Sequence, residues 1–241
     1  MSVALPSVLA ALALSAVHVL APVAATENRI SRRNWLSLAG GISAGYVFVV
    51  LLPELAVRQA ALSVRELRLM AEREIFLSAL AGMAACYWLE HLARRAGNGS
   101  AGWQGRQVDP GLRIHAVAFA SYSALTGYLL IGKGGEGTLE LIAFTFAFAL
   151  HFFVNDQFLR RFHGAAHDRW LRWGLAGAVL TGFTLGLAYP VSHTLESHAY
   201  AFVAGAMILN IFKEELPEER RGNVGLFVLG AVGISSLGLI L

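Results

Sequence analysis

The chain alternates long apolar stretches with short charged segments. Eight stretches contain no Asp, Glu, Lys or Arg, and five of them are at least 19 residues long. About 20 apolar residues cross the hydrocarbon core of a bilayer as an α-helix. The three shorter stretches reach that length when they are extended across a carboxylate. The pattern therefore predicts an all-α, polytopic membrane protein with eight transmembrane helices, at about 3–25, 35–56, 75–93, 114–132, 139–159, 173–192, 197–213 and 223–241.

Composition supports this class. The 241 residues are 56% hydrophobic and only 15% charged, whereas a soluble domain is about 25% charged. These values exclude a soluble globular domain and a disordered chain, and the single cysteine, Cys86, excludes a disulfide-stapled secreted domain. We expect one transmembrane domain over residues 1–241, with a cytoplasmic linker at 94–113. The basic residues lie in short loops, so no nucleic-acid partner is expected.

The distribution of basic residues predicts the orientation. The loops after odd-numbered spans carry 14 Lys and Arg residues, and those after even-numbered spans carry 5. The positive-inside rule then places the odd loops in the cytoplasm and both termini outside, in a cell-membrane protein. Residues 1–25 also resemble a signal peptide because they end in small residues, but they lack a basic start. A retained first helix is favoured; cleavage would leave seven spans.

Two segments share one pattern. Gly41 is followed after twelve residues by Pro53-Glu54, and Gly205 is followed after twelve residues by Pro217-Glu218. The predicted topology runs these two spans in opposite directions, which is typical of the inverted repeats of secondary transporters. The alternative is that Gly and Pro are common in membrane helices and that Pro-Glu marks a helix end, as we expect for Glu54.

Ionisable and polar residues inside the predicted spans are candidates for a site, because burying them in a bilayer is costly. His151 lies near the middle of span 5, and Asn155 follows on the same helix face. An imidazole with amide, hydroxyl and carboxylate oxygens can bind a divalent metal ion. For His151 and the hydroxyl residues the alternative is a hydrogen bond between packed helices, and for Glu214 it is an ion pair with Lys213 at the cytoplasmic rim. The candidate metal residues are His151, Asn155, Asp156, Ser123, Thr126 and Glu214.

The remaining histidines are expected to have structural roles, among them His18, His115, His163 and His167. The sequence contains no Ser-His-Asp order, phosphate-binding Gly-rich loop or CxxC motif, so no enzyme activity and no organic cofactor are expected. An intramembrane metal hydrolase would need three converging ligands on different spans, and the sequence shows no clear set.

At these positions the chain resembles the ZIP (Zrt-/Irt-like) family of divalent-metal transporters. Span 2 ends in Leu51-Leu52-Pro53-Glu54, and span 7 ends in Glu214-Glu215-Leu216-Pro217-Glu218, both typical of that family. The resemblance implies eight spans in inverted-repeat halves and alternating-access transport of an ion such as zinc, manganese or iron. The metal ion would be the substrate.

The chain departs from the family at the metal site. The family pattern His-Ser/Asn-x-x-Asp/Glu-Gly of span 4 is here Tyr122-Ser123-Ala124-Leu125-Thr126-Gly127, and the pattern His-x-x-Pro-Glu-Gly of span 5 keeps only His151. Two carboxylates and one imidazole are therefore missing. We expect a divalent metal transporter with a depleted site; the alternative is a transport-inactive ZIP-like protein that acts as a partner or regulatory subunit. The expected partners are the lipid bilayer and the metal ion, with a homodimer as an open alternative.

Overall fold

The computed structural model describes residues 4–27, 32–65, 73–98, 110–215 and 223–238. Every secondary-structure element in these ranges is a helix. The α-helices are α1 (Ala4–Glu27), α2 (Arg32–Tyr46), α3 (Leu52–Arg65), α4 (Glu74–Asn98), α5 (Pro110–Glu136), α6 (Thr138–His163), α7 (Arg172–Ala188), α8 (His193–Asn210) and α9 (Val224–Gly238). Three π-helical turns join or extend them, at η1 (Val47–Leu51), η2 (His167–Leu171) and η3 (Ile211–Glu215).

Within the described ranges, six helical stretches are long and apolar enough to cross a membrane, and shorter apolar helices cover Leu5–Ala21 and Val224–Ser236. The predicted all-helical architecture is thus confirmed for the described residues, its long apolar helices indicate a multi-pass membrane protein, and a helix occupies the place of each predicted span. The linker is shorter than predicted, because α4 continues to Asn98 and α5 begins at Pro110. Residues 99–109 lie outside the described part.

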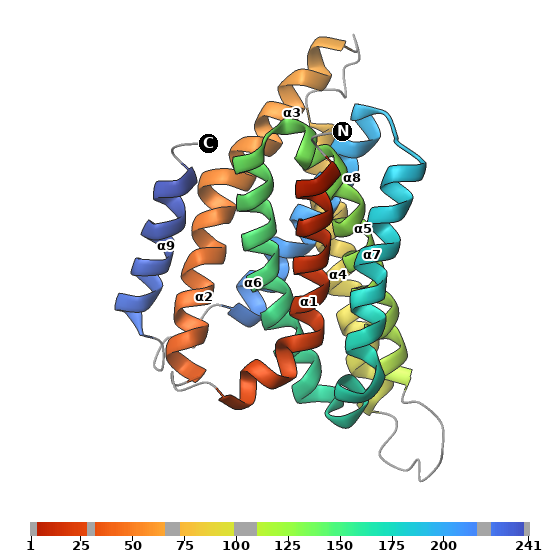
Figure 1. Ribbon diagram of the computed structural model, residues 1–241, viewed down its shortest axis with the longest axis vertical. Coiled ribbons are helices and arrows are strands. Elements are labelled where there is room, and N and C mark those ends of the chain that lie inside the picture. The colour runs from red at the N-terminus through yellow and green to blue at the C-terminus, as the bar shows by residue number, and fades with distance from the viewer. Residues whose placement is uncertain (1–3, 28–31, 66–72, 99–109, 216–222, 239–241) are drawn as a thin grey trace.

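The helices form one bundle in which successive membrane-crossing helices alternate in direction (Figure 1). α1 begins and α9 ends at the same end of the bundle, shown at the top of Figure 1. The most extensive contacts join α5 with α7, α2 with α9, α4 with α8 and α1 with α6. The core lies around α6, whose Phe144, Phe148 and Phe152 are buried together with Tyr46 and Tyr200.

The helix of span 2 does not end at Pro53. It passes through the π-helical turn η1 and continues as α3 to Arg65. A proline inside a helix cannot donate the usual backbone hydrogen bond, and a wider π-turn is one way in which helices absorb such a defect. The expectation that Glu54 marks a helix end is therefore wrong: Glu54 lies inside a continuous helical rod. In the second copy of the pattern, η3 ends two residues before Pro217 in the sequence.

Both repeated glycines lie where two helices touch. A Cβ atom on Gly41 would lie 2.0 Å from the carbonyl oxygen of Phe227 on α9, and one on Gly205 would lie 1.7 Å from the carbonyl oxygen of Ala79 on α4. Membrane helices use such small residues to bring their backbones close together. The two glycines therefore set the α2–α9 and α4–α8 contacts.

α1 is fixed to its neighbours by polar contacts with backbone carbonyls. Ser15 Oγ donates to Ala176 O of α7 at 3.2 Å, and the Gln157 side chain of α6 donates to Ala21 O at 3.0 Å. Arg172 donates to Val19 O at 3.3 Å. Such bonds satisfy groups that cannot reach water inside a bilayer. They hold the middle of α1, including His18, against α6 and α7.

Candidate functional site

The most unusual feature of the bundle is a buried carboxylate held between two imidazoles. Asp156 of α6 faces His18 of α1 through Oδ2, at 2.8 Å from Nδ1. Its other oxygen, Oδ1, lies 2.9 Å from Nε2 of His167 in η2. On the far side of His18, Nε2 lies 3.3 Å from the hydroxyl of Ser123 on α5. Four elements, α1, α5, α6 and η2, thus each contribute one side chain to this row of polar groups.

All four side chains are removed from solvent. Asp156 is 1% exposed and His167 0% exposed, and His18 and Ser123 are equally buried. An isolated ionised carboxylate in such a place would be very costly, so buried charges are paired or neutralised. Each carboxylate oxygen of Asp156 has its own imidazole partner, which meets this requirement.

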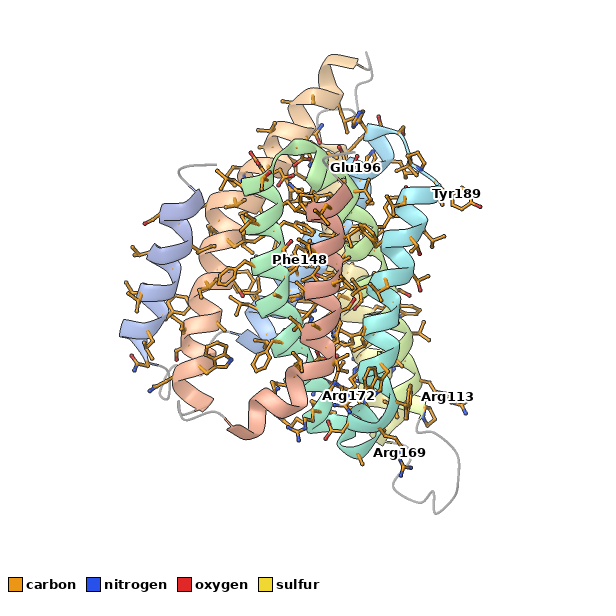
Figure 2. All side chains as sticks on the ribbon, viewed as in Figure 1. Arg113, Phe148, Arg169, Arg172, Tyr189 and Glu196 are labelled. Atoms are coloured by element: carbon orange, nitrogen blue, oxygen red, sulfur yellow. The ribbon has the colours of Figure 1, made fainter. Side chains whose placement is uncertain are left out.

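This row of polar groups reaches the surface at one end of the bundle. His167 Nδ1 lies 3.2 Å from Oδ1 of Asp168, and the Asp168 side chain is 37% exposed. Arg160 also donates to Asp168, at 3.2 Å. Arg169 and Arg172 lie at this same end (Figure 2). It is the end that the distribution of basic residues predicts to be cytoplasmic.

His151 occupies a separate position near the middle of the bundle. Phe148, about one helical turn before it, lies at mid-height in Figure 2. The His151 imidazole is fully buried, and its Nε2 lies 3.1 Å from the amide nitrogen of Asn155. The predicted shared face of His151 and Asn155 is thereby confirmed. The Tyr122 ring of α5 lies 5.7 Å from the imidazole ring, between centroids.

The structure brings only some of the predicted metal residues together. Asp156 and Ser123 meet through His18, and His151 meets Asn155. Thr126 donates its hydroxyl to the carbonyl oxygen of Tyr122, at 2.9 Å. The side chain of Glu214 lies outside the described part of the structure. Among the described residues, no group of three or more His, Cys, Asp or Glu side chains is placed to hold a metal ion.

Sequence reasoning missed His18 and His167 as members of the site. Their partner Asp156 is 138 and 11 residues away, respectively, so no local spacing connects them. One signal was available for His18: it lies in a stretch of 26 residues without Asp, Glu, Lys or Arg. The same rule that selects His151, an ionisable residue inside a predicted span, also selects His18.

The fold assembles a Ser-His-Asp arrangement that the sequence order does not reveal. Ser123 faces Nε2 of His18, and Asp156 faces Nδ1, as in serine hydrolases. Ser123, however, is 1% exposed and lies in the interior of α5, where backbone N–H groups are engaged within the helix. No backbone donors are therefore available beside it to stabilise an oxyanion. The arrangement is better suited to hydrogen-bond relay than to acyl transfer.

A network of ion pairs closes the opposite end of the bundle. Glu54 of α3 accepts from Arg58 at 2.7 Å and from the Tyr200 hydroxyl at 2.6 Å, and it also pairs with Lys133 of α5. Glu136 accepts from Lys133 at 2.8 Å and pairs with Arg58. Two carboxylates and two cations are thus balanced. Their contacts join α3, α5 and α8 at this end of the bundle, next to the buried aromatic residues of the core.

A cavity of about 230 Å³ lies between α4, α5 and α8. Its wall is mostly apolar, and its polar lining includes Cys86, Glu90, His115, Tyr122 and Asn210. Glu90 lies 3.1 Å from Nε2 of His115, and Nδ1 of that ring lies 2.8 Å from His163. Because Tyr122 also contacts His151, the cavity wall reaches the surroundings of the central imidazole.

Comparison of the chain with protein-family models, curated proteins and solved structures finds no match.

Proposed function

We propose that this protein is a secondary transporter of the cell membrane that moves a divalent metal ion of the zinc, manganese or iron type by alternating access. The observation that carries the proposal is the buried Asp156 carboxylate between His18 and His167. Membrane proteins retain ionisable side chains in the bundle interior mainly along ion paths and proton relays. The sequence resemblance to ZIP transporters supports the metal ion as the substrate class.

The pattern of helix contacts supports an eight-span architecture built from inverted-repeat halves. The inverted repeat would match α1 with α7, α2 with α8, α4 with α9 and α5 with α6. Under this matching, the α1–α6 contact corresponds to the α5–α7 contact. The α2–α9 contact corresponds in the same way to the α4–α8 contact. These four contacts are the most extensive in the bundle. The π-turns η1 and η3 begin six residues after Gly41 and Gly205, so they also correspond under this matching. Transporters of this type bind substrate near the midplane.

In this proposal His151 is the central ligand for the metal ion. It lies near the midplane, and a neutral imidazole binds borderline divalent cations. The Asn155 amide nitrogen donates to Nε2 of His151 and fixes the orientation of the ring; a metal ion at Nε2 would replace this hydrogen bond. One imidazole binds a cation weakly, which suits an ion in transit. The ion pairs around Glu54 would close one side of the path, and the cavity beside Tyr122 would belong to the other.

The second candidate function is a transport-inactive ZIP-like partner or regulatory subunit. The observation that favours it is the lack, within the described residues, of a converged group of three metal-binding side chains.

Uptake of Mn²⁺ or Zn²⁺ into proteoliposomes tests which of the two candidate functions is correct. We expect the wild-type protein to accumulate metal above protein-free vesicles and His151→Ala to lose most of this uptake. His91→Ala is the matched control, because His91 is exposed on α4; it should transport at the wild-type rate. Uptake by His151→Ala equal to wild type contradicts the assignment of His151. No uptake by any protein favours the inactive-subunit alternative.

A further inference from the structure

We propose that Asp168, His167, Asp156, His18 and Ser123 form a proton wire that connects one surface of the bundle with its centre. The inference rests on the proposed transport function for what the wire drives, and it identifies the proton as the coupling ion. The contacts are continuous: 3.2 Å from Asp168 to His167, 2.9 Å from His167 to Asp156, 2.8 Å from Asp156 to His18 and 3.3 Å from His18 to Ser123.

Each link has the chemistry that a relay needs. An imidazole can accept a proton on one ring nitrogen and release one from the other, and a carboxyl group can do the same through its two oxygens. In the wire, both ring nitrogens of His167 and of His18 make a contact, and so do both carboxyl oxygens of Asp156. The path of donors and acceptors is therefore continuous through three successive groups, which proton transfer along a wire requires.

One proton can pass along the wire without any of its groups gaining more than one charge. In the starting arrangement of the proposed wire, His167 carries a hydrogen on Nε2, Asp156 on Oδ2 and His18 on Nε2, facing Ser123. Asp168, protonated from solvent, donates its proton to Nδ1 of His167, and His167 releases its Nε2 proton to Oδ1 of Asp156. Oδ2 then passes its proton to Nδ1 of His18. The net result is a charged His18, and only N–H and O–H bonds form or break.

The starting arrangement is suited to burial. With Asp156 and both imidazoles neutral, each buried link has one donor and one acceptor, and no charge is left in the low-dielectric interior. Among the described residues, the charged and titratable groups next to the wire are Arg160 and Arg172 at its surface end, where Asp168 lies, and His151 at its inner end. Asp168 and Arg160 are paired with each other at the point where the proton is taken up.

The inner end of the wire lies beside the proposed cation position. The His18 ring stacks on Phe152 with a centroid separation of 4.5 Å, and the His151 ring lies 6.5 Å from the same phenyl ring. A positive charge on His18 would repel a cation at His151, and such repulsion is strong where water is excluded. A proton and a metal ion therefore exclude each other at the centre. The expected coupling is exchange, in which metal uptake drives proton release.

Proteoliposomes that contain a pH-sensitive dye test the wire. External MnCl₂ is the probe, and potassium with valinomycin clamps the membrane potential. We expect Mn²⁺ uptake by the wild-type protein to raise the internal pH. Asp156→Asn and His167→Gln should reduce this metal-dependent proton flux by about tenfold or more. His91→Gln is the matched control, because His91 is exposed on α4; its flux should stay within about twofold of wild type.

Two failures can be distinguished. Mn²⁺ uptake without a pH change, or normal proton flux in Asp156→Asn, overturns the wire and leaves the transport proposal intact. Absence of Mn²⁺ uptake in every protein overturns the transport proposal, and infrared spectroscopy then tests the wire alone. The wild-type protein should show a protonated-carboxyl band that Asp156→Asn lacks and that shifts in deuterated buffer. If this band is missing from the wild type, the wire is overturned whatever the transport result.

Discussion

At the scale of single residues, one position along α6 separates two different environments. Asn155 follows His151 by four residues, about 40° around the helix, whereas Asp156 follows by five, about 140°. Asn155 therefore contacts His151, and Asp156 points instead to α1 and η2. The sequence places all three in one membrane span, but only the arrangement of the neighbouring helices decides what Asp156 faces.

Removal of the Asp156 side chain should destabilise the bundle strongly. Asp156→Ala leaves one ring nitrogen of each of two fully buried imidazoles without its hydrogen-bond partner, and leaving a buried polar group unsatisfied costs about 1–3 kcal/mol. The control is Asp168→Ala, whose side chain is 37% exposed and whose loss should cost at most about 1 kcal/mol. Reversible unfolding of the purified proteins in detergent measures both. Equal stability losses would show that Asp156 is not part of a tightly packed buried pair.

The candidate site was predictable only in part. His151, Asn155, Asp156 and Ser123 could be selected because each is polar inside an apolar span. His18 and His167 could not be connected with Asp156, because the contact depends on how α1 and η2 pack against α6. Helix–helix packing in a membrane is set by close contacts of small residues rather than by a periodic sequence signal.

At the scale of the helices, the closest backbone contact between α4 and α8 should be the most sensitive to added volume. Gly205→Ala would place a methyl group against the carbonyl of Ala79, at a separation of 1.7 Å that atoms cannot adopt. We expect a loss of about 1–3 kcal/mol in unfolding free energy, since the two helices must separate. Gly177→Ala on α7 meets no atom within 4 Å.

The Gly177→Ala control should leave stability unchanged or raise it by up to about 1 kcal/mol, because alanine favours helix. Thermal unfolding in detergent compares the two variants. If Gly205→Ala is as stable as Gly177→Ala, the α4–α8 contact is looser than described and does not depend on this glycine.

Helix positions were largely predictable, whereas the continuity of one helix was not. Charge-free stretches mark where the chain can enter the bilayer, so each predicted span coincides with a helix. The wrong prediction at Pro53 arises because proline was taken to end the helix. The π-turn η1 accommodates it instead, so Glu54 and Arg58 lie on one rod and join the ion pairs with Lys133.

At the scale of the whole molecule, the orientation of the bundle can be tested with single cysteines. The background is Cys86→Ser, which removes the one native cysteine. Position 165 precedes η2 and α7, and position 193 follows them at the start of α8. Ala165→Cys and His193→Cys therefore place exposed thiols at opposite ends of the bundle. The positive-inside rule predicts that a membrane-impermeant maleimide labels His193→Cys on intact cells and Ala165→Cys only after permeabilisation. The reverse pattern would place the Asp168 end of the wire outside.

The proposed carrier would combine four features of the described residues: a buried imidazole at mid-height, a relay from one surface, ion pairs at the other, and helix contacts that correspond between two halves. A carrier that alternates access exchanges substrate across the membrane even when no net gradient drives it. This property separates it from a transport-inactive protein on the same scaffold.

The most direct test is tracer counterflow by the purified wild-type protein. Vesicles preloaded with unlabelled Mn²⁺ are diluted into a trace of radioactive Mn²⁺, and the label inside is followed over time. Alternating access predicts a transient accumulation of label above equilibrium, abolished by His151→Ala. Label that never exceeds the level in protein-free vesicles would contradict transport and leave the bundle as a scaffold without a conducted ion.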